Sequence, residues 1–262
     1  ELNQPGAYQK VKDTTIVAQF KVVRDAKSEL LFQENESEIS ILAWTTTPWT
    51  LPSNTALAVG KNIRYVKVKT NNQYTHSEVS VILGLETLRK VLRPDQLEKW
   101  VIEGLLDGKF VDSNGKMEYD GIVFYNGAEI PVEVSSILDS RKLGQFSEGI
   151  KSQKTTRGIF VVDSFENVNI PAVLSVTDKK QSEATFNYNG LRIDVWSLEK
   201  LIEDKGVAFY GAELEGIHYE QLMPYVQPDS GDPFRIIIGD FVTTDDGTGI
   251  VHIAPTFGAD DF

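Results

Sequence analysis

Two segments of the chain carry side chains whose types and spacing could do chemistry. The first, residues 44–55 (WTTTPWTLPSNT), holds five Thr, one Ser, one Asn and two prolines. Because proline fixes φ and lacks a backbone N–H, this segment cannot be a regular strand or helix throughout. A rigid loop of hydroxyls and backbone N–H groups suits a ribose, an ester or a phosphate. The alternative is a turn whose hydroxyls bond to their own backbone, and composition leaves both open.

The second segment is residues 245–262 (DDGTGIVHIAPTFGADDF), which places a histidine and two acids near each other in sequence. His252 lies between Val251 and Ile253, a pattern more typical of a core histidine than of a catalyst. Asp260 and Asp261 follow a glycine, where acids usually face solvent or cap a helix. A carboxylate that faced a pocket would instead bind an ammonium group well.

Composition excludes several classes of function. The chain has 262 residues, of which 38 are acidic and 26 basic, for a formal charge of −12. This charge argues against tight, autonomous binding of a polyanion. With no cysteine, thiolate zinc sites, iron–sulfur clusters and cysteine nucleophiles are ruled out, and three histidines make a multi-histidine metal site a poor hypothesis.

The ends of the sequence predict a segment of a larger protein. It begins at Glu1 without an initiator Met and stops at Phe262 just after a turn-rich stretch. It has no signal-peptide pattern and no apolar run near the ~20 residues that span a bilayer.

Hydrophobic periodicity predicts many short strands with helices inserted between them. The expected strands are 14–24, 39–44, 64–70, 119–125, 129–134, 157–163, 207–210, 234–238 and 249–254. Helical spacing covers 84–106, where Pro94 breaks the run and Asp95 is the expected cap of a second helix. A further helix is expected at 194–205, with Asp194 near its start and Gly206 as its stop. Lys67 and Lys69 are expected on a solvated strand face, and 140–156 as a solvated loop. The pattern favours a β-barrel or sandwich core over a doubly wound sheet.

The segments WTTTPWTLPSNTALAV and GTGIVHIAPTFGADDF together resemble the editing domain of isoleucyl-tRNA synthetase, an insertion in the catalytic domain of this class I enzyme. The resemblance covers residues 41–69 and 214–262. Valyl and leucyl relatives carry Arg in the threonine-rich loop, where this chain has Thr47-Pro48-Trp49-Thr50, which points to the isoleucyl branch. The pair Thr256-Phe257 resembles a eukaryote-like branch that some bacteria also carry. Residues 97–210 match nothing in the compact bacterial form, so they are expected to be a branch-specific insertion within a single editing domain, 1–262.

The resemblance implies a mainly β fold with helical insertions, built on a closed six-stranded β-barrel. It implies hydrolysis of the aminoacyl ester of mischarged valyl-tRNA(Ile), with cognate isoleucyl-tRNA(Ile) excluded. Such a second sieve is needed because one methylene is worth only ~1–3 kcal/mol in a binding pocket. The implied partners are the tRNA(Ile) acceptor end, the misattached valine and the rest of the synthetase chain. We expect a cytoplasmic monomer without a membrane partner, metal or cofactor in this domain, since ATP and Mg would belong to the parent's synthetic site.

Residue by residue, the resemblance implies a threonine-rich catalytic pocket. Its catalytic residues would be Thr45, Thr46, Thr47 and Asp261, the last gripping the substrate α-ammonium. Its substrate-binding residues would be Trp49, Thr50, Asn54, His252 and Asp261, with His252 beside the side-chain pocket. No residue looks like a covalent nucleophile, so we expect direct attack by water, with loop hydroxyls and backbone N–H groups stabilising the oxyanion. A non-catalytic module that binds the acceptor end or a partner, and a purely structural insertion, are the alternatives.

Overall fold

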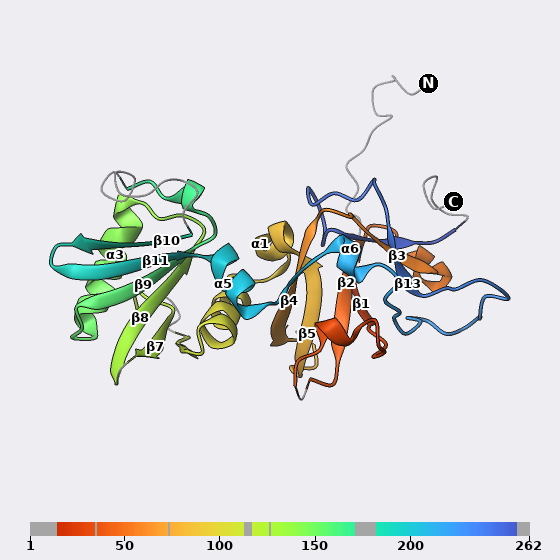
Figure 1. Cartoon of the computed structure of the whole chain (residues 1–262), viewed down its shortest axis with the longest axis horizontal. Coiled ribbons are helices and arrows are strands. Elements are labelled where there is room, and N and C mark those ends of the chain that lie inside the picture. The colour runs from red at the N-terminus through yellow and green to blue at the C-terminus, as the bar shows by residue number, and fades with distance from the viewer. Residues whose placement is uncertain are drawn as a thin grey trace, which may run out of the picture. The chain divides into compact units, whose positions relative to one another are not determined.

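The computed structural model describes residues 15–34, 36–72, 74–112, 117–125, 127–170 and 182–255. The chain divides into two compact units, whose elements are labelled in Figure 1. The first unit comprises residues 1–65, 81–87 and 209–262, and the second comprises 66–80 and 88–208.

The first unit begins with an antiparallel pair, β1 (Ile16–Lys21) and β2 (Ile39–Thr45), in which Ile16 lies opposite Thr45. Alternation along β1 buries Ala18 and Phe20, as the sequence pattern predicts. The pair belongs to a sheet of order β1-β2-β5-β4-β12, with β4 at Arg64–Asn71, β5 at Glu78–Gly84 and β12 at Ala208–Tyr210. Most of β4 and the start of β5 fall within residues 66–80, which are assigned to the second unit.

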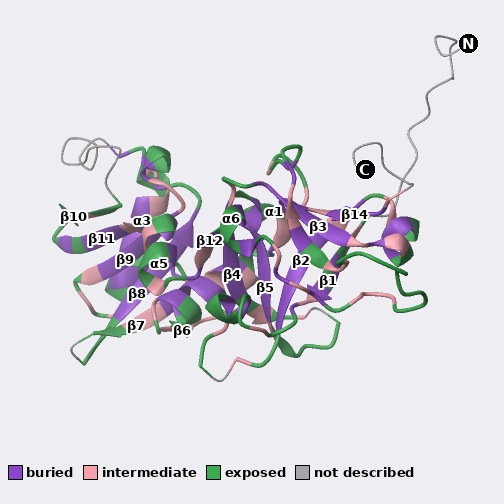
Figure 2. Ribbon diagram, turned by 45° about the vertical axis from the view of Figure 1, so that its right-hand side comes forward, coloured by how far each residue is buried: buried purple, intermediate pink, exposed green. Residues whose placement is uncertain are grey.

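A second sheet of the first unit carries the candidate histidine. Its order is β13 (Arg235–Ile238), β3 (Ala56–Val59) and β14 (Ile250–Ile253). The central strand β3 runs parallel to β13 and antiparallel to β14, and all four of its residues are buried. Figure 2 shows the same pattern, with buried strands and exposed connections. Because β3 is central and fully buried, its neighbour β14 is held in a fixed register, with His252 opposite Leu57.

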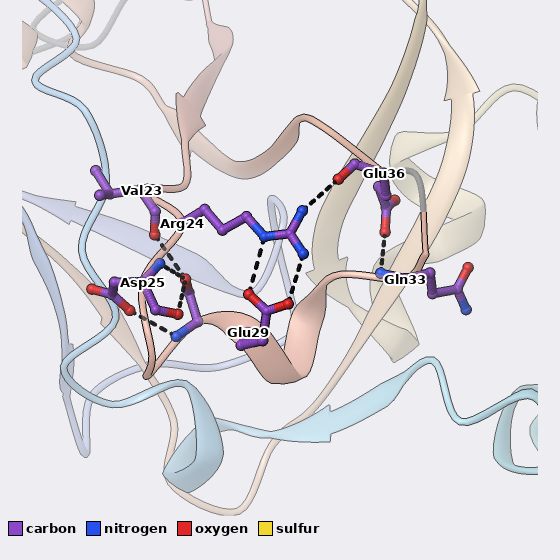
Figure 3. A network of polar contacts seen from close by, with 7 residues as sticks. Val23, Arg24, Asp25, Glu29, Gln33 and Glu36 are labelled. Atoms are coloured by element: carbon purple, nitrogen blue, oxygen red, sulfur yellow. Dashed lines mark hydrogen bonds and ion pairs between the residues drawn. The ribbon is translucent and has the colours of Figure 1, made fainter.

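The connection between β1 and β2 is fastened by polar contacts around the 3-10 turn η1 (Glu29–Leu31), drawn in Figure 3. Arg24 donates two hydrogen bonds to the Glu29 carboxylate, at 2.6 and 3.0 Å. The fully buried Ser28 donates from Oγ to the Val23 carbonyl at 2.8 Å. These contacts hold the turn so that Leu31 packs into the core of the first unit.

The second unit contains a mixed six-stranded sheet of order β10-β11-β9-β8-β7-β6. The strands are β6 (Lys109–Phe110), β7 (Gly121–Tyr125), β8 (Ala128–Ser135), β9 (Arg157–Val162), β10 (Glu183–Tyr188) and β11 (Leu191–Ser197). Strands β8, β9 and β11 are parallel to one another, and antiparallel partners flank them. The chain passes from β8 to β9 through helix α3 (Ser140–Ser152), which forms a β–α–β crossover.

Helix α3 overturns the prediction of a solvated loop at 140–156. Asp139 caps the helix by accepting a hydrogen bond from the Lys142 backbone N–H. Leu143, Phe146 and Ile150 recur at helical spacing and are buried in the core of the second unit. Three apolar residues among glycines, serines and lysines are a weak sequence signal, and it is the sheet beneath them that makes the helix stable.

The remaining helices are short. They are α1 (Leu88–Val91), α2 (Pro94–Lys99), α5 (Leu198–Lys205) and α6 (Gly211–Leu214), with 3-10 turns η2 (Pro48–Ser53), η3 (Leu85–Thr87) and η5 (Phe165–Asn167). A π-helix, η4 (Trp100–Leu105), continues directly from α2. Among the described residues, no helix has both the length and the apolar character needed to cross a membrane.

Of three local predictions at the ends of elements, two are wrong and one is confirmed. The N-cap of α2 is Arg93 instead of Asp95, because Pro94 takes the first helical position, which its fixed φ suits. Asp194 lies in β11, where Arg157 and Arg192 pair with it, and the helix starts after Ser197. The predicted stop at Gly206 is confirmed, with φ of 62°.

Lys67 also differs from its predicted position. Its side chain was expected on a solvated face beside Lys69, but Lys67 is 5% exposed.

The fold class also differs from the expectation. The chain is mixed α/β with three open sheets, and no sheet among the described residues closes into a six-stranded barrel. The two-proline turn η2 separates β2 from β3, so these strands enter different sheets. In the second unit the parallel β8–α3–β9 crossover makes the architecture layered. The sequence pattern missed this because β10, β11 and α3 carry weak or misassigned periodicity.

Candidate functional site

The threonine-rich loop leaves the end of β2 and turns at once into η2. Thr45 is the last residue of β2, and its Oγ1 accepts a hydrogen bond from the Thr47 backbone N–H at 3.0 Å. Thr50 donates from Oγ1 to the Thr47 carbonyl at 2.7 Å. The hydroxyls of Thr45 and Thr50 both approach that of Thr47, each at 3.3 Å. Part of the loop therefore does satisfy its own backbone, which is the alternative that composition left open.

His252 joins this cluster from strand β14, which lies much later in the chain. Its Nε2 lies 3.1 Å from Thr45 Oγ1 and 3.2 Å from Thr50 Oγ1. His252 is 9% exposed, and both threonines are 5% exposed. The structure thus brings together residues 202 and 207 positions apart, which the sequence analysis had named separately.

The other hydrogen bond of Thr50 indicates which atom donates in its contact with His252. Thr50 uses its one hydroxyl proton on the Thr47 carbonyl, so its Oγ1 can only accept from the imidazole. A proton on His252 Nε2 would satisfy this arrangement, shared between Thr50 and Thr45. A nitrogen that already donates cannot accept a proton from water. With Nε2 protonated, His252 acts as a clamp on the loop and that nitrogen is not a general base.

Thr46 and Trp49 point to a different role from that of their neighbours. Both are exposed, Trp49 to 64%. Within the described part of the chain, the Thr46 hydroxyl has no hydrogen-bond partner. These two side chains are the part of the loop that remains open to a bound molecule.

Asn54 ends the loop, and its amide is committed within the protein. Its Nδ2 donates to the Ala56 carbonyl at 2.8 Å and more weakly to the Ile253 carbonyl at 3.3 Å. Its Oδ1 accepts a hydrogen bond of 2.7 Å from the Tyr219 hydroxyl. Asn54 therefore ties the loop to β14, and burial raises the pKa of Tyr219 far above its usual value, so this hydroxyl always donates.

The turn before β14 shows residues that the sequence analysis missed. Gly247 has φ of 67°, and a Cβ there would lie 2.8 Å from the Trp44 ring, so only glycine fits. The Tyr65 hydroxyl donates to the Gly249 carbonyl at 2.8 Å. Burial raises the pKa of Tyr65 to about 12, which keeps its proton in place. The Gly-Thr-Gly sequence was a signal for this turn, but nothing nearby in sequence identified Tyr65 as its anchor.

Asp261, the residue expected to hold the substrate ammonium, lies outside the described residues. So do Asp260, Thr256 and Phe257. Their predicted roles stay predictions.

A separate group of acids lies in the second unit. Glu133 is 9% exposed, and burial together with the Asp120 charge raises its pKa to about 7. Burial and Asp120 also raise the pKa of Glu98 to about 7, and burial raises that of Asp120 itself. Lys142 opposes these shifts and binds Glu133 at 3.1 Å. Within the described ranges, no three His, Asp or Glu side chains are placed to hold a metal ion.

Comparison with known proteins finds isoleucine–tRNA ligases among the relatives. No family model matches the sequence. The chain is 37% identical over 262 residues to the isoleucine–tRNA ligase of Porphyromonas gingivalis, and 38% identical over 261 residues to that of Cytophaga hutchinsonii. In both cases the alignment covers the whole chain but only 15% of the relative, so the chain spans a small part of these proteins. A crystal structure titled GlLeuRS-CP1 covers 94% of this chain and 56% of its own, at 11% identity and a TM-score of 0.41.

The relatives do not support the eukaryote-like branch. Those at 36–38% identity are bacterial. The cytoplasmic isoleucine–tRNA ligase of Arabidopsis thaliana is 29% identical over 255 residues, which cover 97% of this chain and 14% of the relative. The pair Thr256-Phe257 is therefore no guide to the branch.

Proposed function

We propose that this chain is the editing domain of an isoleucine–tRNA ligase and hydrolyses the ester of valyl-tRNA(Ile). The observation that carries the proposal is the contact of His252 with Thr45 and Thr50, which joins the two segments on which the resemblance rests. Similarity to isoleucine–tRNA ligases over the whole chain supports it.

The proposed site divides its polar groups between two tasks. Thr45, Thr50 and His252 hold the loop rigid, because their hydrogen bonds are made to one another and to the loop backbone. Thr46 and Trp49, which are exposed, face the substrate. Thr46 would orient the attacking water or the ester carbonyl, and Trp49 would pack against the terminal ribose or base.

No group in the cluster is placed to act as a nucleophile or as a base through His252 Nε2. We therefore assign the attack to water, oriented by the loop and assisted by the free hydroxyl of the terminal ribose. Asp261 would bind the α-ammonium group and so fix the substrate in one orientation. His252, beside the side-chain pocket, would exclude the larger isoleucyl group by its bulk.

Binding is the first test, because it does not depend on turnover by a chain separated from tRNA-binding parts. The 262-residue chain is titrated with a non-hydrolysable valyl-adenosine analogue and with its isoleucyl counterpart, and amide NMR signals are followed. We expect preferential binding of the valyl compound, with shifts at Thr46, Trp49 and His252. Equal binding of the two compounds would contradict a second sieve, and absence of both would contradict a substrate site here.

Deacylation of valyl-tRNA(Ile) and isoleucyl-tRNA(Ile) then separates an enzyme from a binding module. We expect Thr46→Val to slow valyl release by about 10²-fold, the usual effect of losing one positioned donor. Thr75→Val, at an exposed threonine of the second unit, is the matched control and should leave the rate unchanged. Binding without turnover would favour the non-catalytic acceptor-end module. His252→Ala should raise the rate on isoleucyl-tRNA(Ile) relative to the valyl ester.

A further inference from the structure

A polar cavity of about 360 Å³ lies wholly within the second unit, away from the threonine-rich loop. Its walls come from the end of β4, the start of β5, helix α2, the π-helix η4 and β6. Its volume falls within the range of small-molecule sites. Neither the proposed editing chemistry nor the resemblance uses it.

A tryptophan that lines this cavity carries a hydrogen-bond donor. Trp100 lines the cavity and is 4% exposed. Its indole N–H makes no hydrogen bond to any residue in the described part of the chain. The indole edge is therefore a hydrogen-bond donor that stays available to a molecule in the cavity.

The π-helix keeps this donor uncovered. Gly104 follows Trp100 by four residues and also lines the cavity. A Cβ at Gly104 would lie 2.9 Å from Trp100 Cδ1 and 3.2 Å from Nε1. A side chain at this position would therefore clash with the indole and displace it from its place beside the cavity. π-Helical turns of this kind are frequent at functional sites.

Charged side chains of both signs surround the opening. Lys69 pairs with Glu78 at 2.8 Å, and Lys99 approaches Glu103 at only 3.9 Å. Both pairs are about half exposed, so their members can exchange partners at little cost. Lys99 has the weaker pairing and is the cation most available to an anion. Phe110 adds an aromatic ring to the same wall.

We propose that this cavity binds a nucleotide. A ring nitrogen or carbonyl of the base accepts the hydrogen bond from Trp100, and the base packs on Phe110. The phosphate lies at the opening, where Lys99 and Lys69 reach it. A buried in-plane donor beside an aromatic ring suits a flat heterocycle with acceptors on its edge, and the cations suit its phosphate. The inference does not rest on the editing function, and the nucleotide can be free or part of single-stranded RNA.

The indole N–H signals of the chain's four tryptophans give a direct readout. In ¹⁵N-labelled protein, Trp100→Phe assigns one of the four by its loss. The chain is titrated with AMP, adenosine, a short single-stranded oligoadenylate and free valine. We expect AMP or the oligoadenylate to shift the Trp100 signal saturably, while valine does not. Binding of the oligonucleotide alone would place the natural ligand in RNA, and equal binding of AMP would make a free nucleotide sufficient.

Matched variants distinguish this site from surface attraction. Gly104→Ala displaces the indole and should weaken binding about tenfold or more, as expected for a lost hydrogen bond. Gly144→Ala, in α3 where a Cβ meets nothing within 4 Å, should bind like the parent chain. Lys99→Gln should weaken AMP but not adenosine. The proposal is overturned if the Trp100 signal stays fixed at millimolar nucleotide, if valine shifts it equally, or if Gly104→Ala and Lys99→Gln both bind as the parent does.

Discussion

Replacing Glu133 by Gln should make the stability of the second unit less dependent on pH. Glu133 is buried, and its carboxyl gains a proton more easily than usual, with a pKa of about 7 instead of 4.5. A group whose pKa is raised in the folded state favours folding when protonated, and that contribution fades as pH rises through the folded pKa. The parent chain should therefore lose stability between pH 5 and pH 8 through this group.

The structure sets the size of the effect. A shift from 4.5 to about 7 corresponds to at most about 3 kcal/mol between full protonation and full ionisation. Part of this change falls below pH 5, and the proton is shared with Asp120 and Glu98. We therefore expect Glu133→Gln to be more stable than the parent by about 1–2 kcal/mol at pH 8 and nearly equal at pH 5. Lys142, with its side chain 32% exposed, can turn to water when its partner is removed.

Urea unfolding followed by circular dichroism, at half-unit steps from pH 5 to pH 8, measures the free energy of unfolding of each variant. Glu148→Gln is the matched control, because Glu148 lies on α3, is 66% exposed and pairs only with Lys151 in that helix. Its difference from the parent should stay flat with pH. The reasoning is refuted if the difference between Glu133→Gln and the parent does not grow from pH 5 to pH 8.

Three further predictions concern the candidate site. Thr50→Val removes the hydrogen bond to the Thr47 carbonyl and the contact with His252. Urea unfolding should therefore show a free energy of unfolding lower by about 1–3 kcal/mol, and an unchanged midpoint would contradict the role of these contacts in holding the loop. Tyr219→Phe leaves Asn54 Oδ1 without its donor, so the free energy of unfolding should fall by about 1–2 kcal/mol. Tyr225→Phe is the control, because Tyr225 is 81% exposed, and it should leave the stability unchanged. Asp261→Ala should abolish deacylation of valyl-tRNA(Ile) while the urea midpoint stays that of the parent; full activity would remove Asp261 from the site.

The sequence predicted the first unit better than the second. Apolar residues alternate along β1 and run almost continuously along β2, and both strands form as expected. In the second unit the helix α3 depends on three buried apolar residues, and β11 contains a buried aspartate that resembles a helix cap in sequence. Both elements are fixed by contacts with distant strands, which local periodicity does not report.

The barrel was predicted from a resemblance, and the strand order does not bear it out. Similarity in two motifs carries information about the residues of those motifs, but the closure of a sheet depends on how the edge strands pair. Here β13 and β14 pair with the buried strand β3 in a sheet of their own. The motifs predicted the candidate site residues, but the arrangement of the sheets depends on the segments that connect these motifs.

The threonine-rich loop shows why its two interpretations from sequence were not exclusive. A hydroxyl can satisfy the backbone of its own loop only by giving up its availability to a ligand, and Thr50 does so. With its Nε2 protonated, His252 donates to that oxygen, and this nitrogen then holds the loop and does not accept a proton. The same bonds leave Thr46 at the surface without a partner among the described residues. The threonine that holds the loop rigid and the one that stays available to a ligand therefore lie within six residues of each other. Their spacing in the sequence does not indicate which threonine has which role.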